Sequence, residues 1–340
     1  MCTERVIRKL LPNFAEVKLM IEELWESDNI ENYIVNENNI EEYGGSEELQ
    51  LVKEKKLDKD RCSFVWKKLY CEHYKSAFWN DTKWNNYKDR IKSRKNPYEV
   101  MHIESNCRFS GDVLFSFKSE NDDAKRKGKK YEHYFNFIND DDKLEEENKK
   151  HYLEILSFCN RMNYSLHNMG LMPVVGNLQT VKERYWDRLD RYIFFLNEYF
   201  TIENKEKADL IEKVPSSGGR YPVEVINETD IVKKEKMKDD IKDKRKVQAQ
   251  NEVSEVFKKI ENIAKESGIE DVKDENENGV NIKAGTILYC REMYLIDNND
   301  FLARLIKNGS QPIKNSSDVV NYMKLAIEYW KMKDEILKSK

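Results

Sequence analysis

Hydrophobic residues recur at spacings of three and four along several stretches of the chain, and this period predicts amphipathic helices that bury one face. The clearest stretch is 186–200, where the buried face would carry Trp186, Leu189, Ile193, Leu196 and Phe200. The same period predicts a helix that begins after Asn13 and further helices at 60–78, 143–164, 230–267 and 318–337. Gly268 stands where a left-handed residue would end the helix at 230–267.

Alternation of apolar and polar residues, the period of a β-strand, replaces the helical period over Val100–Phe117. Gly111 interrupts this run, and we interpret it as a bulge or as a place of close backbone approach. Tyr131–Ile138 alternates in the same way and is the expected partner strand. An extended segment is predicted at Met169–Leu178. Shorter strands are predicted at Val223–Ile226, Thr286–Tyr289 and Met293–Ile296.

Together these elements predict an α+β fold that is predominantly helical and has a small antiparallel sheet. We expect an α+β core domain over residues 1–205, a linker at 206–230 and a helical C-terminal region with a short hairpin at 231–340. The linker contains the flexible run Ser216-Ser217-Gly218-Gly219. The chain has only 12 Gly and 6 Pro in 340 residues, which disfavours a sandwich or barrel because those folds need many tight turns.

Composition and charge bear on the kind of partner and on the cellular compartment to expect. Lys and Arg number 59 and Asp and Glu number 63, so the formal net charge is −4. This charge does not predict nucleic-acid binding by the whole surface, and it leaves room for a local basic patch. The longest apolar run, Tyr192–Leu196, is far shorter than the ~20 residues that span a bilayer, and Met1–Phe14 lacks the apolar region of a signal peptide. The six cysteines are scattered without a C-x-x-C pair, as free thiols are. We therefore expect a cytoplasmic protein without membrane contact, and its Lys- and Asn-rich composition is typical of a low-GC bacterium or its phage.

No strong motif for a cofactor or a metal is present. The sequence contains neither G-x-x-x-x-G-K-[ST] nor G-x-G-x-x-G, which are the glycine-rich loops that cradle phosphates, and it lacks the G-x-S-x-G elbow of serine hydrolases. All five histidines lie between His73 and His167, but none has the H-x-H, H-x-x-x-H or H-E-x-x-H spacing of a metal site. We expect no cofactor and no metal ion.

Asp112, His167 and Asp187 are the candidate catalytic residues. Asp112 is a carboxylate in an otherwise apolar strand, and His167 lies in a predicted turn, where catalytic groups commonly sit. If these two converged with Asp187 and Asp190, the four side chains could bind a divalent cation for hydrolysis. The alternative is that Asp112 is a structural residue paired with an arginine such as Arg188.

The segment Trp79–Tyr98 is the candidate nucleic-acid-binding region. It carries a local net charge of +4 with aromatic residues between the cations, and such a surface could stack bases while it meets phosphates. The candidate contact residues are Trp84, Lys88, Arg90, Lys92 and Arg94. The alternative is an amphipathic helix with buried aromatic residues and a solvated lysine face. The charged run Lys233–Lys246 is interpreted as a solvated, salt-bridged helix.

The middle of the chain resembles a family of uncharacterised bacterial proteins. The features that carry the resemblance are Gly111-Asp112 in a strand, a long helix, Met172-Pro173 with Gly176-Asn177, and Asp187-Arg188-Leu189-Asp190 at the start of an amphipathic helix. These features span about residues 100–200. The resemblance implies a compact α+β core and a bacterial accessory-genome context, and it transfers no catalytic residue.

The sequence favours a binding or accessory protein that acts on another macromolecule, either a protein or a nucleic acid. The absence of every strong catalytic motif and the amount of charged helical surface motivate this hypothesis. The alternative is a metal-dependent hydrolase or nuclease that uses acidic residues and His167. The sequence gives no oligomeric state and does not decide between enzyme and binding protein.

Overall fold

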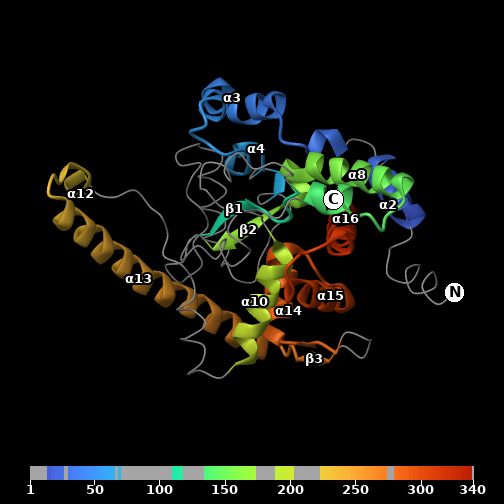
Figure 1. Cartoon of the computed structure of the whole chain (residues 1–340). Coiled ribbons are helices and arrows are strands. Elements are labelled where there is room, and N and C mark those ends of the chain that lie inside the picture. Colours follow the sequence, from blue (N-terminus) through green and yellow to red (C-terminus); the bar gives the residue numbers. More distant parts are fainter. Residues whose placement is uncertain are drawn as a thin grey trace.

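The computed structural model describes residues 14–26, 30–65, 68–69, 109–117, 134–173, 188–202, 223–273 and 279–338. The predicted fold class is confirmed: the chain is mostly helical and has two small antiparallel sheets of two strands each (Figure 1). The helices are α2 (Phe14–Glu26), α3 (Glu37–Lys53), α4 (Ser63–Val65), α7 (Tyr134–Asn139), α8 (Glu146–Arg161), α10 (Leu189–Thr201), α12 (Val223–Asn227), α13 (Ile231–Glu266), α14 (Ala284–Tyr294), α15 (Asn299–Gly309) and α16 (Ser316–Lys338). Short 3-10 helices include η1 (Ile30–Tyr33), η4 (Met162–Tyr164) and η5 (Leu166–Asn168).

The first sheet pairs β1 (Phe109–Val113) with β2 (Met169–Pro173) in antiparallel register. Both strands fall within segments predicted to be extended, but the predicted partner of β1 is wrong. Residues 134–138 belong to α7, where Tyr134 and Ile138 are buried one helical turn apart. The register also runs through Gly111 without a bulge and places Asp112 opposite Gly170.

The long amphipathic helices were predicted correctly. Helix α13 begins after Asp230, whose side chain accepts a hydrogen bond from the backbone of Lys233. It ends before Gly268, which has φ of +67° as the C-cap prediction requires. Helix α16 buries Val319, Met323, Ala326 and Trp330, the face that the sequence assigned to the core.

Three predictions for shorter elements are wrong. Residues 223–226 form helix α12 instead of a strand. The hairpin expected from 286–289 and 293–296 is replaced by helix α14 and the turn that follows it. The second sheet of the C-terminal region lies instead at β3 (Val272–Lys273) and β4 (Asn281–Ile282). Short apolar runs explain the error, because a buried helix and a buried strand cannot be told apart over so few residues.

Two further helices were not anticipated. One is α3, which forms from a largely polar stretch of sequence and is interrupted by Gly45 with φ of 82°. Helix α15 begins after Asn298, whose side chain caps the backbone of Phe301. Of the predicted helix at 60–78, only a short turn around 59–65 and residues 68–69 are described.

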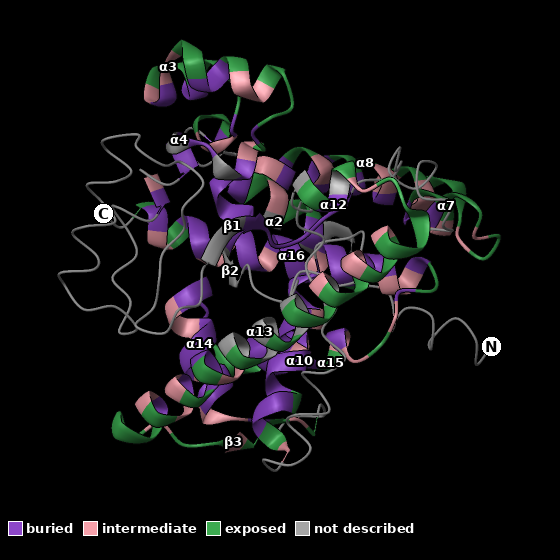
Figure 2. Cartoon of the chain, turned by 90° about the vertical axis from the view of Figure 1, so that its left-hand side faces the viewer, coloured by how far each residue is buried: buried purple, intermediate pink, exposed green. Residues whose placement is uncertain are grey.

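One hydrophobic cluster runs through the described residues, from Val17 in α2 to Leu337 in α16 (Figure 2). Helix α16 packs against α2, α7, α8 and η5, and α10 packs against α15. The linker predicted at 206–230 falls largely on residues 203–222, outside the described residues, so the division into two regions stays a prediction. In the described part of the chain, no helix combines the length and apolar character needed to cross a membrane.

Candidate functional site

Three consecutive residues, the last two of η5 and the first of β2, each bind one side chain of α16. His167 Nε2 lies 3.0 Å from Asp334 Oδ1, and Asn168 Oδ1 accepts a hydrogen bond from Trp330 Nε1 at 3.0 Å. The carbonyl oxygen of Met169 accepts a hydrogen bond from Lys333 Nζ at 2.5 Å. The α16 residues are spaced i, i+3 and i+4, so they share one helix face. We call these six residues the η5–α16 cluster.

His167 is fully buried in this cluster. Burial lowers the pKa of its imidazole, and the hydrogen bond with Asp334 opposes this effect without overcoming it. The imidazole is therefore neutral at pH 7, and its Nε2–H donates to the Asp334 carboxylate. Nδ1 then carries the lone pair, and it has no hydrogen-bond partner among the residues described. The ring of Tyr33 stands edge-on to the imidazole at 5.1 Å between centroids.

Asp334 remains ionised beside this histidine. Burial acts to raise the pKa of its carboxyl group, but the hydrogen bonds with His167 and Lys338 hold the pKa below its ordinary value. Lys338 Nζ lies 2.8 Å from Asp334 Oδ2, one turn along α16. The carboxylate therefore faces a neutral imidazole on one side and a half-exposed ammonium group on the other.

Lys333 is the most unusual member of the cluster. Its side chain is 1% exposed, and its Nζ lies 5.6 Å from the centroid of the Tyr329 ring. Burial lowers the pKa of its ammonium group to about 7. A lysine side chain on a helix is normally solvated, so no feature of the sequence indicates that Lys333 is buried.

Asn168 connects the cluster to the first sheet. Its Nδ2 donates to the carbonyl oxygens of Phe115 and Asn163, and its Oδ1 also accepts from the backbone nitrogen of Phe115 at 2.9 Å. With the Trp330 bond, the amide group is saturated while fully buried. The arrangement is a structural anchor for α16 with titratable groups built into it.

The structure describes two of the three candidate catalytic residues. Asp112 is buried, and its Oδ1 accepts a hydrogen bond from the backbone of Val113 at 3.1 Å. His167 uses Asp334, which the sequence did not suggest as its partner. Asp187 lies outside the described residues, so the convergence of all three stays a prediction.

Arg188, one of the cations suggested as a partner for Asp112, forms a buried ion pair with Asp190. Its Nε lies 3.1 Å from Asp190 Oδ1 and its Nη2 lies 2.5 Å from Asp190 Oδ2. Asn308 Nδ2 donates to the same Oδ2 atom, which ties α15 to this pair. The guanidinium group also lies 5.2 Å from the ring centroid of Tyr322.

The proposed nucleic-acid-binding residues Trp84, Lys88, Arg90, Lys92 and Arg94 all belong to 70–108, outside the described residues. Nucleic-acid binding by these residues therefore stays a prediction. Among the residues that are described, no group of three or more His, Cys, Asp and Glu side chains could hold a metal ion.

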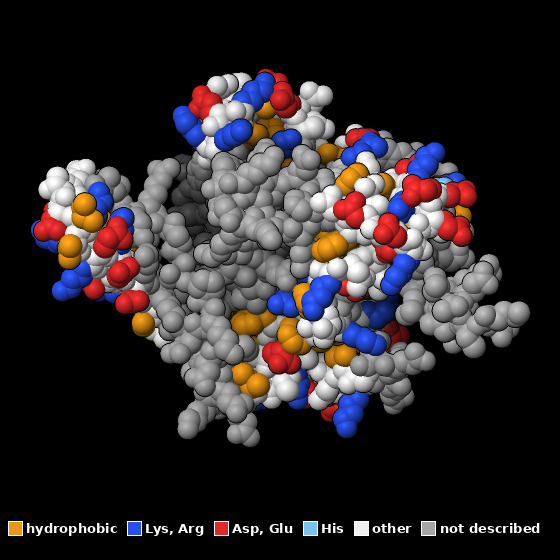
Figure 3. Space-filling view, in the orientation of Figure 1, with side chains coloured by type: hydrophobic (Ala, Val, Ile, Leu, Met, Phe, Trp, Pro, Cys, Tyr) orange, Lys and Arg blue, Asp and Glu red, His pale blue; other side chains and the backbone are white. Residues whose placement is uncertain are grey.

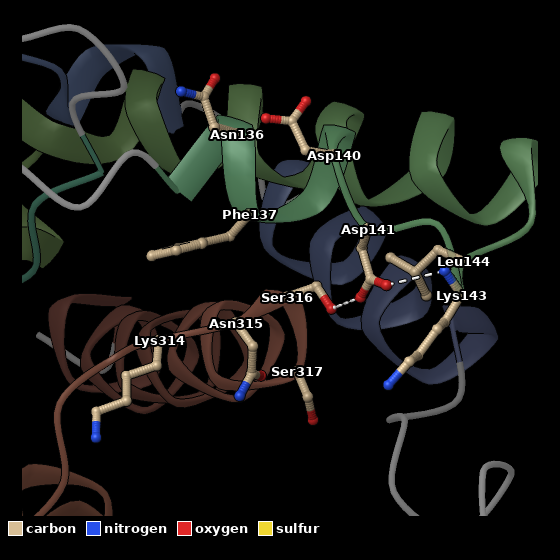
Figure 4. A pocket seen from close by; sticks show the side chains of 10 residues that line it. All are labelled: Asn136, Phe137, Asp140, Asp141, Lys143, Leu144, Lys314, Asn315, Ser316 and Ser317. Carbon is tan, nitrogen blue, oxygen red and sulfur yellow. Dashed lines mark hydrogen bonds between the residues drawn. The ribbon is translucent and has the colours of Figure 1, made fainter.

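A cavity of about 690 Å³ lies between the turn that joins α7 to α8 and the beginning of α16 (Figure 4). Phe137 and Leu144 supply its apolar wall. Ser316 Oγ donates to Asp141, and this bond lowers the pKa of the Asp141 carboxyl group. The remaining lining residues are Asn136, Asp140, Lys143, Lys314, Asn315 and Ser317. The lining contains two lysines and two aspartates, so its net charge favours neither an anionic nor a cationic ligand.

Helix α13 extends from the α10–α14 region, and its N-terminal half leads away from the other labelled helices toward α12 (Figure 1). Its C-terminal half is anchored by Phe257, whose ring contacts Phe195, Tyr199 and Phe200 of α10. In the N-terminal half, Ile231 is 77% exposed and Val232 is 80% exposed. Figure 3 shows apolar, basic and acidic side chains together at this end of the molecule.

Comparison of the chain with protein-family models, with curated proteins and with solved structures gives no match. The geometry and chemistry of the described residues are therefore the basis for a functional proposal.

Proposed function

We propose that the protein is an interaction protein that binds another macromolecule through the N-terminal half of α13. One observation carries the proposal. Of the five large hydrophobic side chains that are exposed in the described part of the chain, three lie in this half: Ile231, Val232 and Val247, the last 56% exposed. Ile231 and Val232 are adjacent, and adjoining exposed apolar side chains are typical of a contact surface, while Val247 lies further along the same helix.

The helix itself supports an external role. Helix α13 has 36 residues and is about 54 Å long at 1.5 Å per residue, more than its buried segment requires. Among the side chains of α13 that the structure describes, the buried ones are Val256, Phe257, Ile260 and Ala264, all in its C-terminal half. The C-terminal half therefore anchors the helix, and the N-terminal half supplies surface.

The chemistry of this half favours a protein partner over a nucleic acid. Exposed Glu235, Asp239, Asp240 and Asp243 lie among the lysines, and Lys238 pairs with Glu235 at 2.6 Å. Interleaved acidic residues would repel a phosphate backbone, while mixed charge around apolar side chains matches the rim and centre of a protein interface. A nucleic acid remains the alternative partner, through Trp79–Tyr98.

The test is site-specific photo-crosslinking in cells of the source organism. A photoreactive residue placed at Val232 is expected to give a discrete crosslinked product, and the same residue at Leu19 is the matched control. Like Val232, Leu19 is an exposed aliphatic residue, 58% exposed, but it lies on α2. The double variant Ile231→Ser/Val247→Ser should abolish the product without changing the thermal midpoint, because both side chains are exposed.

Fluorescence anisotropy with labelled DNA and RNA at two salt concentrations distinguishes the alternative. Salt-sensitive binding that survives the α13 double variant would move the proposal to Trp79–Tyr98. Identical crosslinking at Val232 and Leu19, with no nucleic-acid binding, would overturn the interaction proposal altogether.

The remaining expectations are part of this proposal. A cytoplasmic location in a bacterium or its phage, and an accessory role, follow from the composition and from the resemblance over residues 100–200. No described residue favours the alternative of a metal-dependent hydrolase, since His167 is enclosed and bound to Asp334.

A further inference from the structure

The last third of α16 is held to η5 and β2 by buried titratable side chains. Lys333 reaches the carbonyl oxygen of Met169 in β2, and Asp334 reaches His167 in η5. Both contacts join α16 to a segment more than 160 residues earlier in the chain, and both are buried. A change of protonation here acts directly on the docking of the helix.

We propose that residues 330–338 of α16 form a pH-controlled latch, which is closed on η5 and β2 when Lys333 and His167 are uncharged and loosens when they are protonated. In its uncharged form the amine of Lys333 can still donate an N–H to the carbonyl oxygen of Met169. Its ammonium form would bring a full charge into a site enclosed on all sides. Opening the latch returns that charge to water.

His167 acts in the same direction. When it is protonated, Nδ1 becomes a second N–H donor, and this atom is buried with no acceptor among the described residues. The new charge would gain from Asp334 but would be repelled by Lys333 and Lys338. Protonation therefore strains the closed state, although the imidazole keeps its carboxylate partner.

The charged groups described around Lys333 do not supply it with a carboxylate partner. On α16, Asp334 is engaged by both His167 and Lys338. From α2, Glu23 pairs with Lys331. From α8 the contact is Phe158 against Trp330, from η1 it is the ring of Tyr33 against His167, and α7 contributes Tyr134 against Tyr322. Burial alone lowers the pKa of Lys333, so none of the described carboxylates offsets its ammonium form.

The sign of the effect follows from proton linkage. The pKa of Lys333 is about 7 in the closed state and rises toward the ordinary ~10.4 when the latch opens. The open state therefore binds more protons between these values, and closure strengthens as pH rises through this window. Because the pKa of His167 is also lowered on closure, a further weakening is expected as pH falls below ~6.5.

Amide hydrogen exchange of the full-length protein tests the latch. Protection factors, corrected for intrinsic exchange rates, are measured for amides of 331–338 and for α14 as an internal reference. Titration of Lys333 predicts that protection of the latch rises about 15-fold from pH 7 to pH 8.5, if opening exposes the amine fully. Protection of α14 should not follow this profile.

Variants assign the effect to its source. Lys333→Met and Lys333→Gln should each reduce the rise between pH 7 and pH 8.5 to less than about twofold, and glutamine keeps a donor for Met169. The matched control is Lys331→Met on the same helix, where the side chain is 37% exposed and pairs with Glu23. This variant should keep the wild-type profile. His167→Gln should keep the rise above pH 7 and lose the weakening below ~6.5.

A flat wild-type profile between pH 7 and pH 8.5 would overturn the proposal, and this measurement needs no variant to fold. A full rise that persists in Lys333→Gln would overturn it as well, because the titrating group would then lie elsewhere. The proposal is independent of any partner that α13 binds.

Discussion

The indole nitrogen of Trp330 donates a hydrogen bond to the side-chain oxygen of Asn168 across 162 residues of sequence. Asn168 also binds both backbone groups of Phe115, at the end of the first sheet. One amide group thus ties the β1 segment, η5 and α16 together inside the core. The same place carries the titratable residues of the η5–α16 cluster, so the stability of the core and its response to pH have a common origin.

Asn168→Ala should therefore be among the most destabilising substitutions in the described part of the chain. It removes partners from Trp330, Phe115 and Asn163, all of which remain buried, and each buried group left unsatisfied costs about 1–3 kcal/mol. We expect a loss of about 3 kcal/mol or more in the free energy of unfolding, measured by urea denaturation.

Asn139→Ala is the matched control for this substitution. Asn139 is exposed at the end of α7, and its side chain donates only to Asp140 nearby. Its removal should change the free energy of unfolding by less than about 0.5 kcal/mol. Similar losses for the two variants would mean that the amide of Asn168 does not organise the core.

The buried ion pair of Arg188 and Asp190 predicts a different response to single and double substitution. Asp190→Ala removes the carboxylate from a fully buried guanidinium group, which typically costs about 3–5 kcal/mol. Arg188→Met/Asp190→Leu removes both charges and should destabilise the protein less than Asp190→Ala does. Thermal and urea unfolding of the three proteins check this order. A double variant that is less stable to unfolding than Asp190→Ala would show that the pair contributes more than the mutual neutralisation of two charges.

Gly309 ends α15 where it meets the backbone of α10. A Cβ atom at this position would lie 2.1 Å from the carbonyl oxygen of Asp190 and 2.4 Å from its carbon. Since the obstacle is backbone, the two helices must separate, and Gly309→Ala should cost about 3 kcal/mol. Gly268→Ala is the comparison, because a Cβ there meets nothing within 4 Å and only the φ of +67° opposes it, which costs about 1 kcal/mol. Equal losses in thermal stability would contradict the close approach of α10 and α15.

The sequence predicted the elements whose pattern extends over many turns. Val319, Met323, Ala326 and Trp330 lie on one helix face over about three turns, and no strand register produces that spacing. The strands predicted within 286–296 are wrong because the apolar run is short, and the strand predicted at 134–138 is wrong because alternating aromatic residues also fit a helix with Tyr134 and Ile138 inward. Pairing between distant segments, such as β1 with β2, leaves no local pattern to read.

The sequence predicted only part of the η5–α16 cluster, because the contacts within it also join distant segments. His167 stood out as a histidine in a turn, but its partner Asp334 lies 167 residues later, in a helix rich in charge. In such a helix Lys333 and Asp334 look like solvated residues, because sequence alone does not reveal that one face turns into the core. Tertiary packing, and not residue type, makes these groups unusual.

Asp334→Asn tests the contribution of the Asp334 carboxylate to the η5–α16 cluster. Near neutral pH the asparagine oxygen can still accept from His167 Nε2–H, so the loss should be about 1 kcal/mol, the difference between a charge-assisted and a neutral hydrogen bond. The pKa of Asp334 is lowered in the folded protein, so its carboxylate contributes stability above ~3.9, and this contribution is lost as pH falls through the folded-state value. The difference between wild type and variant should therefore be largest above pH ~3.9 and should shrink as pH falls below that value, as measured by urea denaturation from neutral to acidic pH. Asp297→Asn, which removes an exposed carboxylate, separates this site from the change in net charge. A difference that stays constant down to pH 2 would show that Asp334 is not the ionised partner of His167.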